Sequence, residues 1–186
     1  MPRLLILLPL LYLGLHASLS RAAEPRIEAI SDTEFAFELD DSRINVRIRD
    51  RVLRDKKDML LDWVVYSAEA VRDYYDRFPV DSVDIDLQVA GGRAVRFGRA
   101  FGGEHPRLRI VVGENVTPET LRRDWIMVHE MVHLAMADVP QEHRWLLEGL
   151  ATYVESIARA RRGDLASRAR PMPNERTIQC RGWRVP

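Results

Sequence analysis

The sequence has almost no cysteine and no surplus of charge of either sign. Cys180 is the single cysteine among 186 residues, so an internal disulfide and a cysteine-based metal cluster are both excluded. The formal net charge at pH 7 is zero, so no basic excess indicates nucleic acid or an anionic membrane surface as a partner. Hydrophobic residues make up 46% and charged residues 30%, which is typical of one globular domain with a real core.

Long apolar runs are also missing, apart from a short one near the N-terminus. Arg3 precedes the leucine-rich segment 4–15, and Ser20 and Ala22 occupy the minus-three and minus-one positions of a cleavage site. This layout is typical of a secretory signal peptide, and the run is short for a membrane span. We therefore expect 1–22 to be a signal peptide and the mature protein to be periplasmic or secreted, without a stable membrane span. The alternative is an uncleaved N-terminal anchor.

The remaining chain mixes the patterns of strands and helices. Alternating apolar and polar residues predict strands at 34–39, 44–49, 83–89 and 107–113. Apolar residues at helical spacing predict a helix within 52–78 and others after residue 117 and after Pro140. The segment 90–105 contains five glycines and predicts either a loop or an irregular edge strand. The expected fold class is α+β, with a small mixed sheet packed on helices.

The segment "DWIMVHEMVHLAM", 124–136, places polar side chains within an apolar helix pattern. We expect one helix over 118–137. His129 and His133 are four residues apart and so share one helical face, while Glu130 lies to the side. Two imidazole ligands with a neighbouring general base are what an H-E-x-x-H pattern supplies to a zinc ion. The alternative is a buried helix whose histidines bond to nearby polar groups.

A catalytic zinc ion usually has three protein ligands and one open position. A histidine-based extension of the motif is excluded, because Met136 and Val139 occupy the positions where its glycine and histidine would be. A carboxylate from the helix after Pro140 is the other source, and Glu148 lies near the start of that helix. His143 is a rival third ligand, but two histidines and a glutamate are an attested catalytic set. We expect one Zn²⁺ held by His129, His133 and Glu148.

The sequence resembles the gluzincin metallopeptidases, in particular the bacterial peptidase-MA-like family. The likeness rests on "HEMVH" followed by "WLLEGLATYVE" and extends over 107–161. It implies a zincin-like domain over 23–162, with Glu148 as the third zinc ligand and Glu130 as the catalytic base. It also implies that an edge strand before the metal helix binds the substrate backbone, and Arg96 or Arg99 would then meet a substrate carboxylate. A flexible loop with solvated arginines is an equally good interpretation of that segment.

Other side chains near the motif are expected to support the metal site or to pack in the core. Thr152 and Glu155 lie one and two turns beyond the third ligand, so either is expected to contact a metal-ligating side chain. Trp125, Trp145 and Tyr153 are expected in the core.

The expected function is that of an exported zinc-dependent peptidase, which hydrolyses peptide or protein substrates through a zinc-activated water. The segment 163–186 contains three prolines but neither tyrosine nor histidine, and we expect a disordered or truncated tail. Because the family often uses a later tyrosine or histidine to stabilise the oxyanion, an inactive zinc-binding module for peptide or envelope partners is the alternative.

Overall fold

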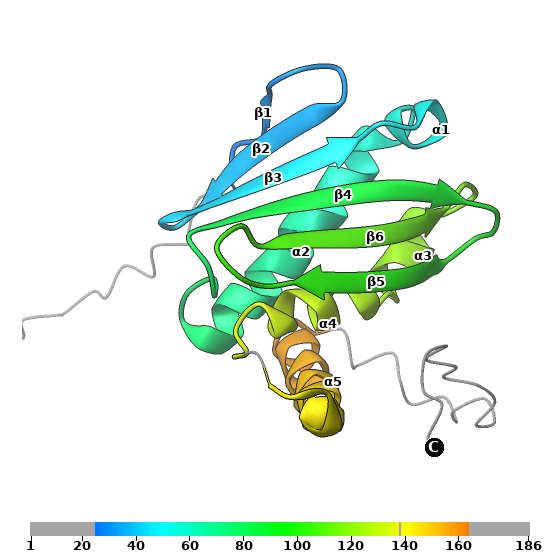
Figure 1. The fold of residues 1–186 in the computed structure, drawn as a ribbon. Helices are drawn as coiled ribbons and strands as arrows, with labels where there is room; N and C mark the ends of the chain where they lie inside the picture. The colour runs from blue at the N-terminus through cyan, green and yellow to red at the C-terminus, as the bar shows by residue number, and fades with distance from the viewer. Residues whose placement is uncertain (1–24, 138, 164–186) are drawn as a thin grey trace, which may run out of the picture.

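The computed structural model describes residues 25–137 and 139–163. Six strands form one mixed sheet in the order β1-β2-β3-β4-β6-β5, and α2 and α4 lie against one of its faces (Figure 1). The strands are β1 (Glu28–Ala29), β2 (Glu34–Leu39), β3 (Ser42–Ile48), β4 (Ser82–Ala90), β5 (Val95–Phe101) and β6 (Arg107–Gly113). The predicted α+β class and all four predicted strands are therefore confirmed. The glycine-rich segment forms β5, the edge strand that was one of its two interpretations.

The pairing of the strands follows from their connections. β2 and β3 form an antiparallel hairpin whose turn contains Asp40 in the left-handed region, with φ of 54°. β3 pairs in parallel with β4, which in turn pairs in parallel with β6. β5 is antiparallel to β6, and no other strand of the described residues pairs with its outer edge.

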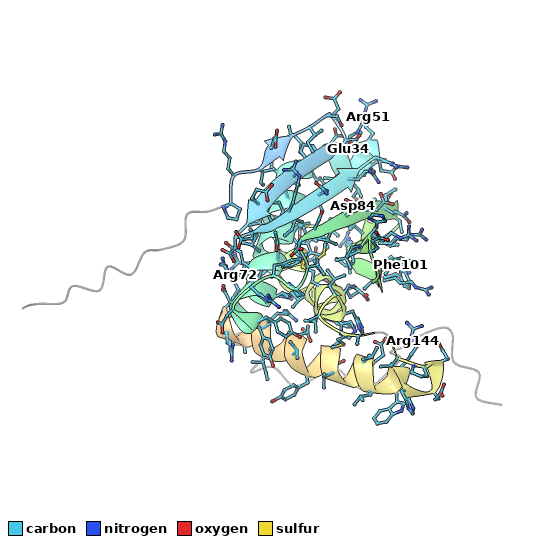
Figure 2. All side chains as sticks on the ribbon, turned by 60° about the vertical axis from the view of Figure 1, so that its left-hand side comes forward. Glu34, Arg51, Arg72, Asp84, Phe101 and Arg144 are labelled. Atoms are coloured by element: carbon cyan, nitrogen blue, oxygen red, sulfur yellow. The ribbon has the colours of Figure 1, made fainter. Side chains whose placement is uncertain are left out.

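The helices lie in two groups along the chain, one between β3 and β4 and the other after β6. They are α1 (Arg51–Arg54), α2 (Lys57–Tyr75), α3 (Pro118–Arg122), α4 (Ile126–His133) and α5 (Arg144–Arg161), with a 3₁₀ turn, η1 (Gln141–His143), before α5. The predicted helix within 52–78 is present as α1 and α2. Figure 2 shows α5 running along the lower side of the molecule, with Arg144 at one end. Among the described helices, none is both long and apolar enough to cross a membrane.

One apolar core joins the inner face of the sheet to the helices. Alternate residues of β3, β4 and β6 point inward and pack on α2 and α4, because a strand presents every second side chain to the same face. The fully buried side chains include Ile44, Ile48, Ile85, Leu87, Leu108, Ile110, Leu60, Met127 and Met131. The core holds α4 firmly under β5 and β6, which fixes the position of the histidine motif.

The prediction of a single helix over 118–137 is wrong. The chain forms α3 and α4 with a break between them, because the carboxylate of Asp124 accepts hydrogen bonds from the N–H groups of Ile126 and Met127, both at 3.1 Å. A side chain that accepts these bonds starts a new helix, as an N-cap does. The expected start of the first helix is confirmed, since Thr117 caps α3 and Pro118 is its first residue.

Two parts of the expected domain organisation fall outside this description. The expected signal peptide, 1–22, and the expected tail, except Gly163, lie outside the described residues.

Candidate metal centre

The two histidines of the motif lie on the side of α4 that faces α5. The Nε2 atoms of His129 and His133 are 3.2 Å apart. Glu148, in the first turns of α5, brings its Oε2 atom to 3.2 Å from the Nε2 of His129 and 3.5 Å from that of His133. The three expected ligands therefore meet at one point, although Glu148 comes from a different helix.

The triangle formed by these three atoms has the size of one face of a tetrahedral zinc site. With zinc–ligand bonds of about 2.0–2.1 Å, two ligand atoms of a tetrahedron are roughly 3.3 Å apart. The observed edges are 3.2, 3.2 and 3.5 Å. The spacing of the His129, His133 and Glu148 ligand atoms therefore suits a single metal ion.

Hydrogen bonds alone cannot satisfy all three contacts. Each Nε2 atom either carries one hydrogen or has one lone pair, and an ionised carboxylate only accepts. If both histidines donate to Glu148, their two N–H groups oppose each other across 3.2 Å. If His133 donates to His129, the lone pair of His129 faces the carboxylate at 3.2 Å, and if His129 donates to His133, the lone pair of His133 faces it at 3.5 Å. A cation between the three atoms removes this conflict, and we regard that as the strongest local argument for a metal.

The electrostatic surroundings favour neutral imidazole at one ligand. Burial lowers the pKa of His133, against the opposing attraction of Glu148, and His129 and Arg144 lower it further. The Nδ1 atom of His129 is buried and has no hydrogen-bond partner among the described residues. Metal-binding histidines usually donate from this atom, so His129 is held by packing instead, with the Trp125 ring edge-on at 5.3 Å.

Glu130, the expected catalytic base, is attached to the edge of the sheet. Its Oε2 atom accepts a hydrogen bond of 2.7 Å from the backbone N–H of Ala100 in β5. Burial raises the pKa of Glu130 to about 7, even though the Ala100 bond and the charge of Arg99 oppose the rise. A carboxylate with a pKa near neutrality is suited to both accepting and returning a proton.

The contact between α4 and β5 depends on Gly98. A Cβ atom at this position would lie 2.5 Å from the Cγ of Glu130 and 2.5 Å from the Cγ2 of Ile126. Any side chain there would push α4 away from the strand, because heavy atoms do not approach so closely. The spacing of residues in the sequence did not identify this glycine, since its role depends on which helix packs against it.

Solvent reaches the metal centre from the side of α5. The side chain of Glu148 is 46% exposed, against 8% for His129 and 15% for His133. This combination leaves room for a water or substrate group while the histidines stay anchored in the core.

The neighbouring residues do not all follow the expectations. The Thr152 hydroxyl donates to the backbone carbonyl of Glu148 rather than to its carboxylate, and Glu155 pairs with Arg159 instead of contacting a ligand. The expectation that Trp145 and Tyr153 are core residues is wrong, since each is 64% exposed.

Trp125 and His143 are two further exposed residues near the histidine motif. Trp125 is 36% exposed rather than buried in the core. His143, the rival third ligand, is exposed in η1 and does not belong to the group that can hold the metal.

A second polar cluster on α5 contacts the connection between α3 and α4. The buried guanidinium of Arg159 bonds to Glu155 at 2.7 Å and to the backbone carbonyl of Arg123 at 3.4 Å. Its charge also acts on Asp124, whose carboxyl pKa burial raises to about 6. The sequence contained a usable signal for Asp124, because aspartate before an apolar helical run is a common N-cap.

No protein-family model, curated protein sequence or solved structure matches the chain.

Proposed function

We propose that the protein is a zinc-dependent metallopeptidase of the gluzincin type, which acts outside the cytoplasm on peptide or protein substrates. The observation that carries this proposal is the meeting of His129, His133 and Glu148 at tetrahedral spacing. Glu130 lies beside them on the same helix and is held by Ala100 of the sheet edge. The export part rests on the signal-peptide pattern of 1–22.

Zinc is the metal that suits this ligand set. Two imidazole nitrogens and one carboxylate oxygen form a known catalytic zinc set, and zinc accepts tetrahedral geometry without preference from its d electrons. Calcium and magnesium favour six or more oxygen ligands, so a centre with two nitrogen donors does not suit them. The open side at Glu148 provides the fourth position that a catalytic site needs.

The roles of the residues follow from their positions. A bound zinc ion would supply a Lewis acid and a water molecule of lowered pKa. Glu130 takes a proton from water and passes it to the leaving amine, as a general base and then a general acid. The Ala100 N–H holds the Glu130 carboxylate in one orientation. Apart from the Ala100 N–H, which Glu130 occupies, the outer edge of β5 offers main-chain groups to an extended peptide, which can add as a further strand.

The metal part of the proposal is tested by metal analysis of protein lacking residues 1–22. We expect about one zinc per chain in the parent and almost none in His129→Ala. Less than about half an equivalent in the parent, unchanged by His129→Ala, would contradict the assigned site.

The hydrolytic part is tested separately with Glu130→Gln. We expect this variant to keep its zinc and to lose peptidase activity by about 10²–10⁴-fold, the usual contribution of a general base. Glu142→Gln is the matched control, because Glu142 is an exposed glutamate in η1 outside the metal centre. If the parent binds zinc but cleaves nothing, the alternative of an inactive zinc-binding module is correct. If Glu130→Gln cleaves as fast as the parent, the assigned base is wrong.

A further inference from the structure

A cleft of about 300 Å³ opens beside the metal centre, between the end of β5 and the start of α5. The lining residues are Arg99, Ala100, Phe101, Gly102, Val139, Gln141, Arg144 and Leu147. Figure 2 shows Arg144 at its end of α5 on the same side of the molecule as Phe101. The cleft has the volume of a small ligand-binding site.

The cleft adjoins the groups that would carry out the reaction. Ala100, one of its lining residues, holds the carboxylate of Glu130. Leu147 immediately precedes Glu148 in α5. The cleft therefore lies where a peptide along β5 at the metal centre would place a side chain or its terminus.

The charge in the cleft has one sign. Arg99 and Arg144 stand on its two walls, one from the strand and one from the helix, and none of its described lining residues is acidic. Neither arginine forms an ion pair with a carboxylate among the described residues. Both are exposed, and each acts electrostatically on a residue of the centre, Arg99 on Glu130 and Arg144 on His133.

We propose that Arg99 and Arg144 are specificity-determining residues that bind a carboxylate of the peptide substrate. The carboxylate is either an acidic side chain near the cleaved bond or the free C-terminus of a short peptide. This inference rests on the proposed peptidase function. Guanidinium groups bind carboxylates through paired N–H donors, and two of them on opposite walls favour a charged group over its neutral analogue.

The other arginines near β5 do not share this arrangement. Arg107 and Arg109 lie on β6, with their guanidinium groups 4.7 and 6.0 Å from the centre of the Phe101 ring. Neither lines the cleft. Arg99 is also near this ring, at 5.2 Å, so Arg107 provides a control with the same residue type and the same aromatic neighbour.

The proposal is tested with matched peptides that differ by one charge. One series scans Glu against Gln at each position around the cleaved bond, and a second compares a free C-terminal carboxylate with a C-terminal amide. We expect the parent to prefer the charged member of one series by about tenfold or more in kcat/KM, the effect of one charge-assisted contact. The series in which the preference occurs identifies the source of the carboxylate.

Variants then assign the preference to the cleft. In Arg99→Gln/Arg144→Gln, we expect the charged and neutral peptides to be cleaved within about twofold of each other, since no guanidinium remains to distinguish them. Arg107→Gln should keep the preference of the parent. Equal cleavage of charged and neutral peptides by the parent overturns the proposal, and so does a preference that survives in the double variant.

Binding measurements separate this inference from the proposed function. Fluorescence anisotropy with labelled peptides and Glu130→Gln protein reports recognition without turnover. A charged-peptide preference in this protein that disappears when Arg99 and Arg144 are also changed supports the carboxylate site, even if the parent hydrolyses nothing. Equal affinity for charged and neutral peptides contradicts it, even if the parent is an active peptidase.

Discussion

Helix α5 makes two polar contacts of opposite character, one with the connection between α3 and α4 and one with α4 itself. At one end, the charge of Arg159 is matched by Glu155 and by a backbone carbonyl, and the cluster is almost completely buried. At the other end, His129, His133 and Glu148 bring together three atoms that hydrogen bonds cannot all satisfy, and one of the three side chains is half exposed. We call the first the ionic junction and the second the metal junction.

The comparison distinguishes a contact whose polar groups satisfy one another from a contact whose polar groups can bind a ligand. The ionic junction is complete within the described residues, because donors meet acceptors and opposite charges are adjacent. The metal junction leaves at least one close contact without a hydrogen bond, and a cation between the three atoms would remove that conflict. Both junctions involve α5, but the ionic junction joins it to the connection between α3 and α4, whereas the metal junction joins it to α4.

The largest effect is expected at the metal junction. His133→Ala removes one ligand and should weaken zinc binding by more than the roughly 10–100-fold that changes outside the ligand sphere cause. Competition with a chromophoric chelator measures this affinity. His143→Ala is the control, because His143 is exposed and lies nearby without joining the ligand group. Parent-like affinity in His133→Ala, or loss of zinc in His143→Ala, contradicts the ligand assignment.

The next effect concerns the ionic junction. Glu155→Ala should lower the free energy of unfolding by about 3 kcal/mol, because the buried Arg159 loses a carboxylate partner. The estimate lies at the lower end of the usual range because the charge of Asp124 also faces Arg159. Urea denaturation measures the change, and the zinc content should stay the same.

The chain offers a matched control for this substitution. Glu119 and Arg123 form a pair with the same i,i+4 spacing and the same 2.7 Å distance, but their side chains are 73% and 74% exposed. Glu119→Ala should cost less than about 1 kcal/mol, since solvent screens an exposed pair. Equal losses for Glu119→Ala and Glu155→Ala would show that burial does not strengthen the ionic junction.

A smaller effect is expected where α4 contacts the sheet edge. Gly98→Ala should destabilise the protein by about 1–3 kcal/mol through overpacking, and it should reduce peptidase activity by moving Glu130 away from Ala100. Gly91→Ala is the control, because a Cβ at Gly91 meets nothing within 4 Å. Thermal unfolding and zinc content are measured together. Full activity and unchanged stability in Gly98→Ala would mean that the close packing of α4 on β5 is not needed.

The metal junction was predictable from the sequence because its main constraint is local. An α-helix places His129 and His133 on one face whatever the rest of the fold does, and Glu148 needs only a turn between two antiparallel helices. The strands were predictable for the same reason, since the alternation of apolar residues in 34–39 and 107–113 reflects burial of one face.

What the sequence did not predict depends on partners far away in the chain. The role of Gly98 requires knowledge that Glu130 and Ile126 pack on it. The break before α4 was not predicted, because the buried residues keep their helical spacing across it. At the break, the Asp124 carboxylate accepts the hydrogen bonds that backbone carbonyls would accept in a continuous helix. Trp145 and Tyr153 were assigned to the core from residue type, whereas the exposed face of α5 carries both.

The smallest effect is a change of slope with pH at the ionic junction. Burial raises the pKa of Asp124 from its ordinary value to about 6, so the folded state holds this proton more tightly than the unfolded chain does. The Asp124 contribution to the unfolding free energy therefore decreases as pH rises from about 4 to about 6, by an amount on the order of 1 kcal/mol because the residue is partly exposed.

Asp124→Asn keeps an oxygen acceptor for the start of α4 and should remove this part of the slope. Urea denaturation of both proteins between pH 4 and 7, with a chelator present to exclude metal binding, measures the difference. Identical slopes would mean that Asp124 has the same pKa in the folded and unfolded states. The charge of Asp124 would then make no pH-dependent contribution to the stability of the ionic junction.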